Sequence, residues 1–100
     1  MADALARLWT KFLPDIEQRV ALLEAAAKAL AASELSDEQR VVAHGAAHKL
    51  AGTLGTFGMP HGTEVARKTE WLLVENPAAD AAAELTGWAA ELRMLVDGRK

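Results

Sequence analysis

Apolar residues recur every three or four positions along most of this 100-residue chain, and no segment alternates between apolar and polar residues with a period of two. Spacing by three and four gathers apolar side chains on one face of a helix, whereas alternation is typical of strands. The chain is also rich in Ala, Leu and Glu, and it contains no Tyr. The sequence therefore predicts an all-α fold.

Proline, glycine and a capping signature divide this pattern into helices. Pro14 fits the first turn of a helix, where its missing N–H costs no hydrogen bond. Ser36 and Gln39 have the spacing of a capping box. Gly58 ends the helix that follows, and Pro60 opens the next. The predicted helices are Asp3–Phe12, Pro14–Ala32, Asp37–Phe57, Pro60–Val74 and Ala78–Val96, the last ending before Gly98.

The connections between these helices are short, which favours antiparallel neighbours. We therefore expect an up-down-up-down four-helix bundle, with the short helix Asp3–Phe12 as an extra N-terminal element at one end. Residues 1–100 suit a single domain with a modest core. Trp9, Trp71 and Trp88 lie among aliphatic residues and are expected at or near the core. The other side chains predicted to face the core are Ile16, Val20, Leu23, Ala27, Leu30, Val42, Ala46, Leu50, Thr53, Leu54, Phe57, Val65, Thr69, Leu72, Leu73, Leu85, Leu92 and Leu95.

The composition argues against several classes of protein. Apolar residues make up 51% of the chain, charged residues 25%, and the net charge is −3. The basic residues are scattered, which disfavours binding to nucleic acid or to an anionic membrane. Without cysteine there are no disulfides, thiol catalysis or thiolate metal sites. No apolar run is long enough to span a bilayer and the N-terminus lacks a signal-peptide pattern, so we expect a cytoplasmic monomer.

The segment Val41–Gly58 places a histidine among glycines. At 100° per residue, His48 projects away from the predicted apolar stripe of its helix. Glycine inside a helix costs about 1 kcal/mol relative to Ala, so a cluster of them calls for a reason. The residues predicted to surround His48 on this face are His44, Gly45, Ala51, Gly52 and Gly55. The pattern indicates an exposed nucleophile on a surface cleared for a docking partner, although close helix packing is the alternative reason for Gly52 and Gly55.

His48 through Gly58 (HKLAGTLGTFG) resembles the signature of histidine-containing phosphotransfer (HPt) domains, and Val65–Leu73 (VARKTEWLL) resembles the next helix of that family. The resemblance implies the same four-helix bundle and a role as a phosphorelay intermediate rather than an enzyme. An aspartyl phosphate on a response-regulator receiver domain would pass its phosphoryl group to His48, which would hand it to another receiver. The implied partners are receiver domains and a hybrid histidine kinase. Each receiver would supply Mg²⁺, so this chain would need no cofactor of its own.

The residue types suit this chemistry. A neutral imidazole is nucleophilic near pH 7, since an unperturbed His titrates near about 6.5. Gly52 has no side chain to obstruct a partner closing over His48, and Glu70 could accept a hydrogen bond from the His48 Nδ1–H, leaving Nε2 free to attack. The family usually carries a Lys three residues after the histidine, where this chain has Ala51. The candidates for the missing cation are Lys49, Arg67 and Lys68.

Two alternatives remain open at this stage. Ala51 is compatible with a pseudo-HPt adaptor that binds receiver or kinase domains without carrying phosphate. His44 and His48, spaced by four residues, could share a metal ion with His61 as a third ligand. However, Gly45 stands where the zinc-protease motif has Glu, and no acidic ligand lies near in sequence, so no metal site is predicted. His44 is expected at the rim of the docking surface instead.

Overall fold

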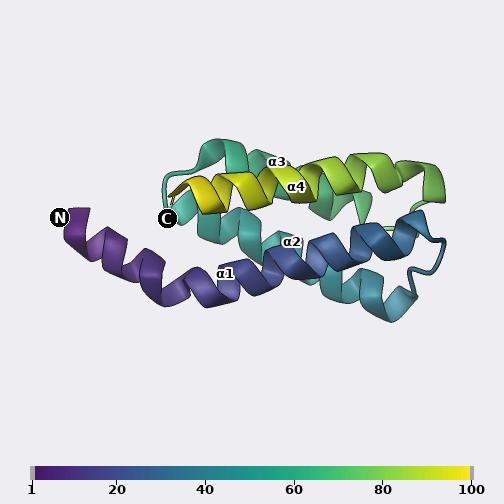
Figure 1. Ribbon diagram of the computed structural model, residues 1–100, viewed down its shortest axis with the longest axis horizontal. Helices are drawn as coiled ribbons and strands as arrows, with labels where there is room; N and C mark the ends of the chain where they lie inside the picture. Colours follow the sequence, from purple (N-terminus) through teal and green to yellow (C-terminus); the bar gives the residue numbers. More distant parts are fainter. Residues whose placement is uncertain (1, 100) are drawn as a thin grey trace.

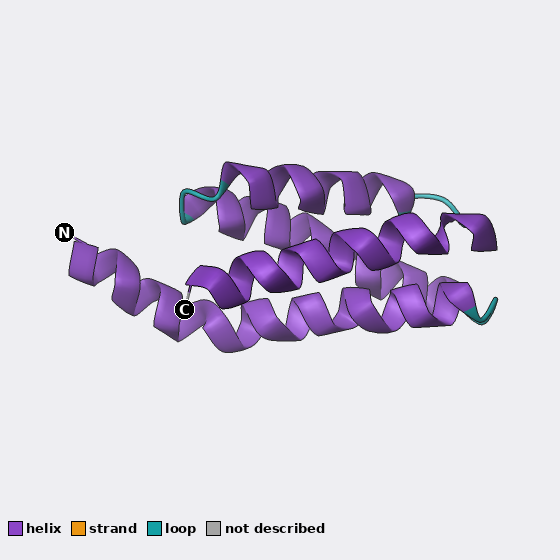
Figure 2. Ribbon diagram, turned by 45° about the horizontal axis from the view of Figure 1, so that its top comes forward, coloured by secondary structure: helices purple, strands orange, loops and turns teal. Residues whose placement is uncertain are grey.

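The computed structural model describes residues 2–99, which are helical throughout apart from the short connections. Helix α1 spans Ala2–Ala31, α2 Asp37–Thr56, α3 Pro60–Leu72 and α4 Ala82–Arg99, with a 3₁₀ turn at Ala79–Ala81 before α4. The four helices pack as a bundle about 46 Å long (Figures 1 and 2). Helix α2 contacts α1 and α3, and α4 contacts the same two helices, so α2 and α4 occupy opposite corners. The predicted four-helix bundle is confirmed.

The prediction of a separate N-terminal helix is wrong. Asp3–Phe12 is helical but continues through Pro14 into α1, and its first turns extend beyond the rest of the bundle (Figure 1). A proline inside a helix destabilises it by about 3 kcal/mol, so tertiary packing on both sides of Pro14 must keep α1 continuous. Trp9 is 5% exposed and meets Phe57 edge-on at 5.1 Å between ring centroids, while Ile16 is fully buried beyond the proline.

The ends of α2 follow local sequence signals. Ser36 is the N-cap, and its Oγ accepts a hydrogen bond from the Gln39 backbone N–H at 3.0 Å. At the other end Gly58 has a φ of 70°, a conformation that favours glycine. The Met59 N–H then donates to the Leu54 carbonyl at 2.9 Å, which gives the hydrogen-bond pattern of a Schellman motif. Ser36 as the N-cap and Gly58 as the stop of this helix are therefore confirmed.

Helix α4 runs further than predicted. The sequence places its end before Gly98, but the helix continues to Arg99. The Arg99 guanidinium lies 4.9 Å from the centre of the Trp9 ring and 5.6 Å from that of Phe57. These cation–π contacts favour the last helical turn and offset the cost of the glycine.

The core is built from the predicted faces of α1, α3 and α4, but the buried face of α2 is rotated towards α3. Val42 is 49% exposed, whereas Ala43, Ala47 and Ala51 are buried together with Leu50 and Leu54. A row of alanines lets α2 approach both of its neighbours closely, and packing against two helices rather than one widens the buried stripe. Trp71, predicted at the core, is 72% exposed on α3. Thr53, Leu72, Trp88 and Leu95 are only partly buried.

Among residues 2–99, no helix combines the length and the apolar character needed to cross a membrane.

Candidate functional site

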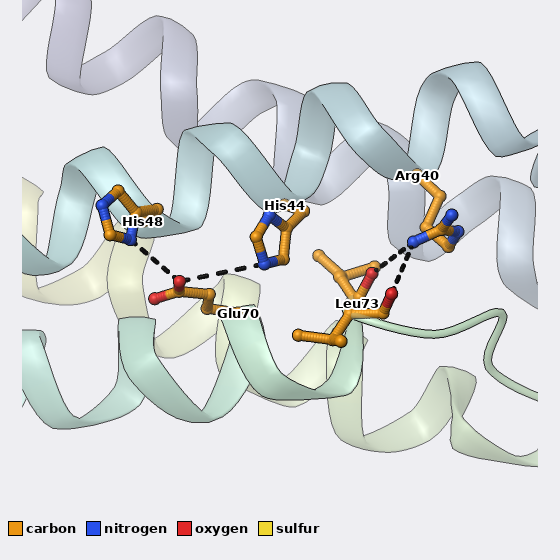
Figure 3. Close-up of polar contacts among 6 residues, drawn as sticks. Arg40, His44, His48, Glu70 and Leu73 are labelled. Atoms are coloured by element: carbon orange, nitrogen blue, oxygen red, sulfur yellow. Dashed lines mark hydrogen bonds and ion pairs between the residues drawn. The ribbon is translucent and has the colours of Figure 1, made fainter.

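His48 lies on the outer face of α2 with 72% of its side chain exposed. Its Nδ1 atom is 2.8 Å from Oε2 of Glu70 on α3 (Figure 3). An ionised carboxylate can only accept hydrogen bonds, so Nδ1 carries the proton in this contact and Nε2 keeps its lone pair. The contact predicted between Glu70 and His48 is present, and it leaves a nucleophilic nitrogen at the surface.

Two side chains link α3 to α2, one on either side of Glu70, and together they make three hydrogen bonds. Near the start of α3, Thr63 Oγ1 donates to the Ala51 carbonyl at 2.8 Å. At its end, Arg40 Nη1 donates to the carbonyls of Leu73 and Val74, both at 2.9 Å (Figure 3). Because Glu70 lies between these two links, sliding α3 along α2 would break one or both.

His44 stands one turn before His48 and faces the same carboxylate. Its Nε2 is 3.8 Å from Oε2 of Glu70, and 34% of its side chain is exposed. That separation is longer than a hydrogen bond but short enough for an electrostatic contact. Glu70, which is 18% exposed, therefore lies between two imidazoles (Figure 3).

The glycines around His48 differ in their surroundings. A Cβ added at Gly45 or Gly52 would meet no atom within 4 Å, so the space above both is open. A Cβ at Gly55 would lie 3.2 Å from Thr63 Oγ1, and one at Gly62 would lie 2.9 Å from Leu54 Cδ1. The structure thus favours helix packing as the reason for Gly55, whereas Gly52 is compatible with clearance for a partner.

The three candidate cationic side chains differ in their direction from His48 and in their ion-pair partners. Lys49 is exposed on α2 but points about a quarter-turn away from His48. Lys68 forms an ion pair with Glu64 at 3.4 Å. Arg67 is exposed one turn before Glu70, and within the described residues no carboxylate pairs with it.

The prediction that Ala51 lies beside His48 on the exposed face is wrong. Ala51 is 4% exposed and packs towards α3, since α2 is rotated relative to the predicted orientation. The antiparallel register pairs His48 with Glu70 and Gly55 with Thr63. Counting along both helices from these pairs brings Arg67 level with Ala51.

His61 contacts a different carboxylate from the other two histidines. Its Nε2 lies 3.2 Å from Oε2 of Glu91 on α4, whereas His44 and His48 both face Glu70. Within residues 2–99, no three His, Asp or Glu side chains form a group that could hold a metal ion.

Arg40, Thr63 and Gly62, which align α3 with α2, are not predicted from the sequence. A threonine and a glycine in the first turn of a helix carry no signal that separates an interhelical contact from an exposed position. The two carbonyls that Arg40 holds are 33 and 34 residues away, so only the tertiary structure brings them together.

Comparison with known proteins identifies the family of this chain. The family model of the Hpt domain matches residues 7–98. Protein RcaC of Microchaete diplosiphon is 35% identical over 69 residues, which are 69% of this chain but 11% of that protein. No solved structure matches the chain. The chain belongs to the Hpt domain family, whose members serve as histidine phosphotransfer modules in phosphorelays.

Proposed function

We propose that this chain is a phosphorelay intermediate in which His48 accepts a phosphoryl group from a receiver-domain aspartate and donates it to another. The observation that carries the proposal is the His48 ring, 72% exposed with Nδ1 against Glu70. A buried or oppositely oriented imidazole would hide Nε2, whereas this one presents it to a partner.

The transfer step follows from this orientation. The Nε2 lone pair attacks phosphorus, a P–N bond forms, the P–O bond of the acyl phosphate breaks, and the receiver's carboxylate leaves as an anion. The phosphorylated ring keeps its Nδ1 proton and gains a positive charge, which the Glu70 carboxylate offsets at 2.8 Å. Donation to a second receiver is the reverse step. The receiver's Mg²⁺ would neutralise the phosphoryl oxygens in both directions.

The surroundings of His48 suit a receiver that closes over it. The open space above Gly45 and Gly52 admits the partner's active-site loops. Arg67, level with Ala51, takes the role of the family's usual Lys, because its guanidinium can donate two hydrogen bonds to phosphoryl oxygens. Contacts of this transient kind bury less than about 1,200 Å² in total.

Intact-mass analysis after incubation with phosphoramidate tests the acceptor. We expect one acid-labile phosphoryl group on the wild type and none on His48→Ala. His61→Ala is the matched control, since His61 is also exposed, at 61%, but lies against Glu91 on α4. Labelling that survives His48→Ala and disappears with His61→Ala would contradict the assignment.

A second candidate function rests on Ala51, which is buried and places no cation beside His48. In this alternative the chain is an adaptor that binds a receiver or kinase domain without carrying phosphate. His48→Ala distinguishes the two, because an adaptor variant would still bind and signal, whereas a relay variant would bind but transfer nothing.

A further inference from the structure

The Glu70 side chain has three rotatable bonds, so its carboxylate can adopt several positions. It must keep one oxygen against the Nδ1 proton of His48, a ring that is itself 72% exposed. A single contact to an exposed partner holds a carboxylate poorly, because both side chains lose rotamer freedom when they pair. Arg67 also lies exposed one turn before Glu70 on α3, at a spacing from which it could compete for the same carboxylate.

His44 approaches the same oxygen of Glu70 from the other side. Its Nε2 lies 3.8 Å from Oε2 (Figure 3), and within residues 2–99 His44 has no other polar side-chain partner. With 34% of its side chain exposed, His44 is less free than His48. One turn earlier on α2, Arg40 is bonded to the carbonyls at the end of α3, which fixes the spacing of the two helices beside His44.

We propose that His44 is a positioning residue for His48 and acts through Glu70, an inference that rests on the proposed function. The His44 Nε2–H directs a positive hydrogen at Oε2, which holds the carboxylate between the two rings. Held there, Glu70 keeps the proton of His48 on Nδ1 and the lone pair on Nε2. A carboxylate oxygen has room for two donors, so the contact with His44 does not displace His48.

The same contact serves the phosphorylated state. After transfer, the His48 ring carries a positive charge that faces Glu70, and a phosphoryl group with negative charge stands on its other side. A carboxylate that turned away towards Arg67 would leave this ring charge uncompensated. His44 opposes that turn, so its removal also shortens the lifetime of phosphohistidine.

The test uses three variants of the full chain. His44→Leu fills similar space but donates no hydrogen bond, whereas His44→Gln keeps a side-chain N–H donor. Glu70→Gln removes the negative charge through which His44 is proposed to act. Circular dichroism and thermal melting establish that each variant folds, and His44→Ala carries the same expectation if His44→Leu is unstable.

The first readout is the ¹⁵N spectrum of the His48 ring in the unphosphorylated protein, which distinguishes the two tautomers without any phosphoryl donor. We expect His48 of the wild type to carry its proton on Nδ1. In His44→Leu the signals should shift towards the Nε2–H tautomer, and His44→Gln should restore the wild-type signals. Equal spectra for the wild type and His44→Leu would overturn the inference.

The second readout is the initial rate of labelling by phosphoramidate. His44→Leu should lower it about twofold to fivefold, as expected for the loss of one partly exposed electrostatic contact. In the Glu70→Gln background, His44→Leu should have no additional effect. An effect that persists in that background overturns the route through Glu70. If the wild type itself is not labelled, the proposed function fails, while the spectra still decide the role of His44.

Discussion

Gly52→Ala should make the bundle more stable and transfer from a receiver slower. Gly52 lies inside α2 and an added Cβ would meet nothing within 4 Å, so the substitution introduces no clash in the free protein. The hydrogen bond from Thr56 Oγ1 to the Gly52 carbonyl uses only the backbone of residue 52 and survives. No contact within the described residues therefore requires glycine at this position, which is what the proposed clearance for a receiver predicts.

The expected stability gain is about 0.5–1 kcal/mol, the difference between Gly and Ala inside a helix. For a domain of this size, such a gain raises the melting temperature by roughly 2–8 °C. An extra methyl group between two packed surfaces costs about 1–3 kcal/mol, so receiver affinity should fall by at least about fivefold. Labelling by phosphoramidate, a small donor, should keep its rate.

Gly87→Ala is the matched control for this experiment. Gly87 lies inside α4, also with nothing within 4 Å of an added Cβ, and α4 occupies the corner of the bundle opposite α2. It should give the same rise in melting temperature by circular dichroism and leave receiver transfer unchanged. The reasoning fails if Gly52→Ala transfers from a receiver as fast as Gly87→Ala does.

Three further outcomes are expected. Glu70→Gln should slow phosphoramidate labelling of His48 by about tenfold or more, because a charge-assisted hydrogen bond is lost; an unchanged rate would mean that Glu70 does not orient the ring. Thr63→Val should lower the unfolding free energy by about 1 kcal/mol in urea titrations, since Thr63 Oγ1 no longer donates to the Ala51 carbonyl. Arg93→Ala should cost about 1 kcal/mol or less, an effect that shrinks with added salt, because Arg93 pairs with Glu24 at 2.8 Å while still partly exposed. The Glu24 hydrogen bond raises the pKa of Arg93. The contribution of this ion pair to the unfolding free energy is therefore fully present below the ordinary pKa of arginine and is lost only as the pH rises through the raised pKa.

Local signals explain which helix ends could be predicted. Ser36, Gly58 and Pro60 each act through the backbone within a few residues, and the structure ends α2 and begins α3 where these residues predict. Pro14 is also a local signal, but the burial of Trp9 against Phe57 outweighs it and keeps α1 continuous. Whether a proline ends a helix depends on tertiary packing of residues distant in the sequence, which local sequence signals do not reveal.

The sequence predicts those features of the site that depend on residue spacing along a single helix. The exposure of His48 follows from its angle on α2, which lies opposite the apolar stripe of that helix. The rotation of α2 that buries Ala51 instead depends on two neighbouring helices at once. The approach of His44 to Glu70 depends on the level of α3 along α2, which Thr63 and Arg40 set through contacts distant in sequence.

The contacts between α2 and α3 therefore affect both the stability of the fold and the orientation of the His48 ring. Its alignment depends on a hydrogen bond near the start of α3 and two at its end, and Glu70 lies between them. The α1–α4 pair is joined by Arg93 and Glu24, and among the described residues it contributes none to the polar contacts of His48. Substitutions that loosen α1 from α4 should thus lower stability without changing the His48 tautomer. Those that let α3 move along α2 should change both, even where they touch neither His48 nor Glu70.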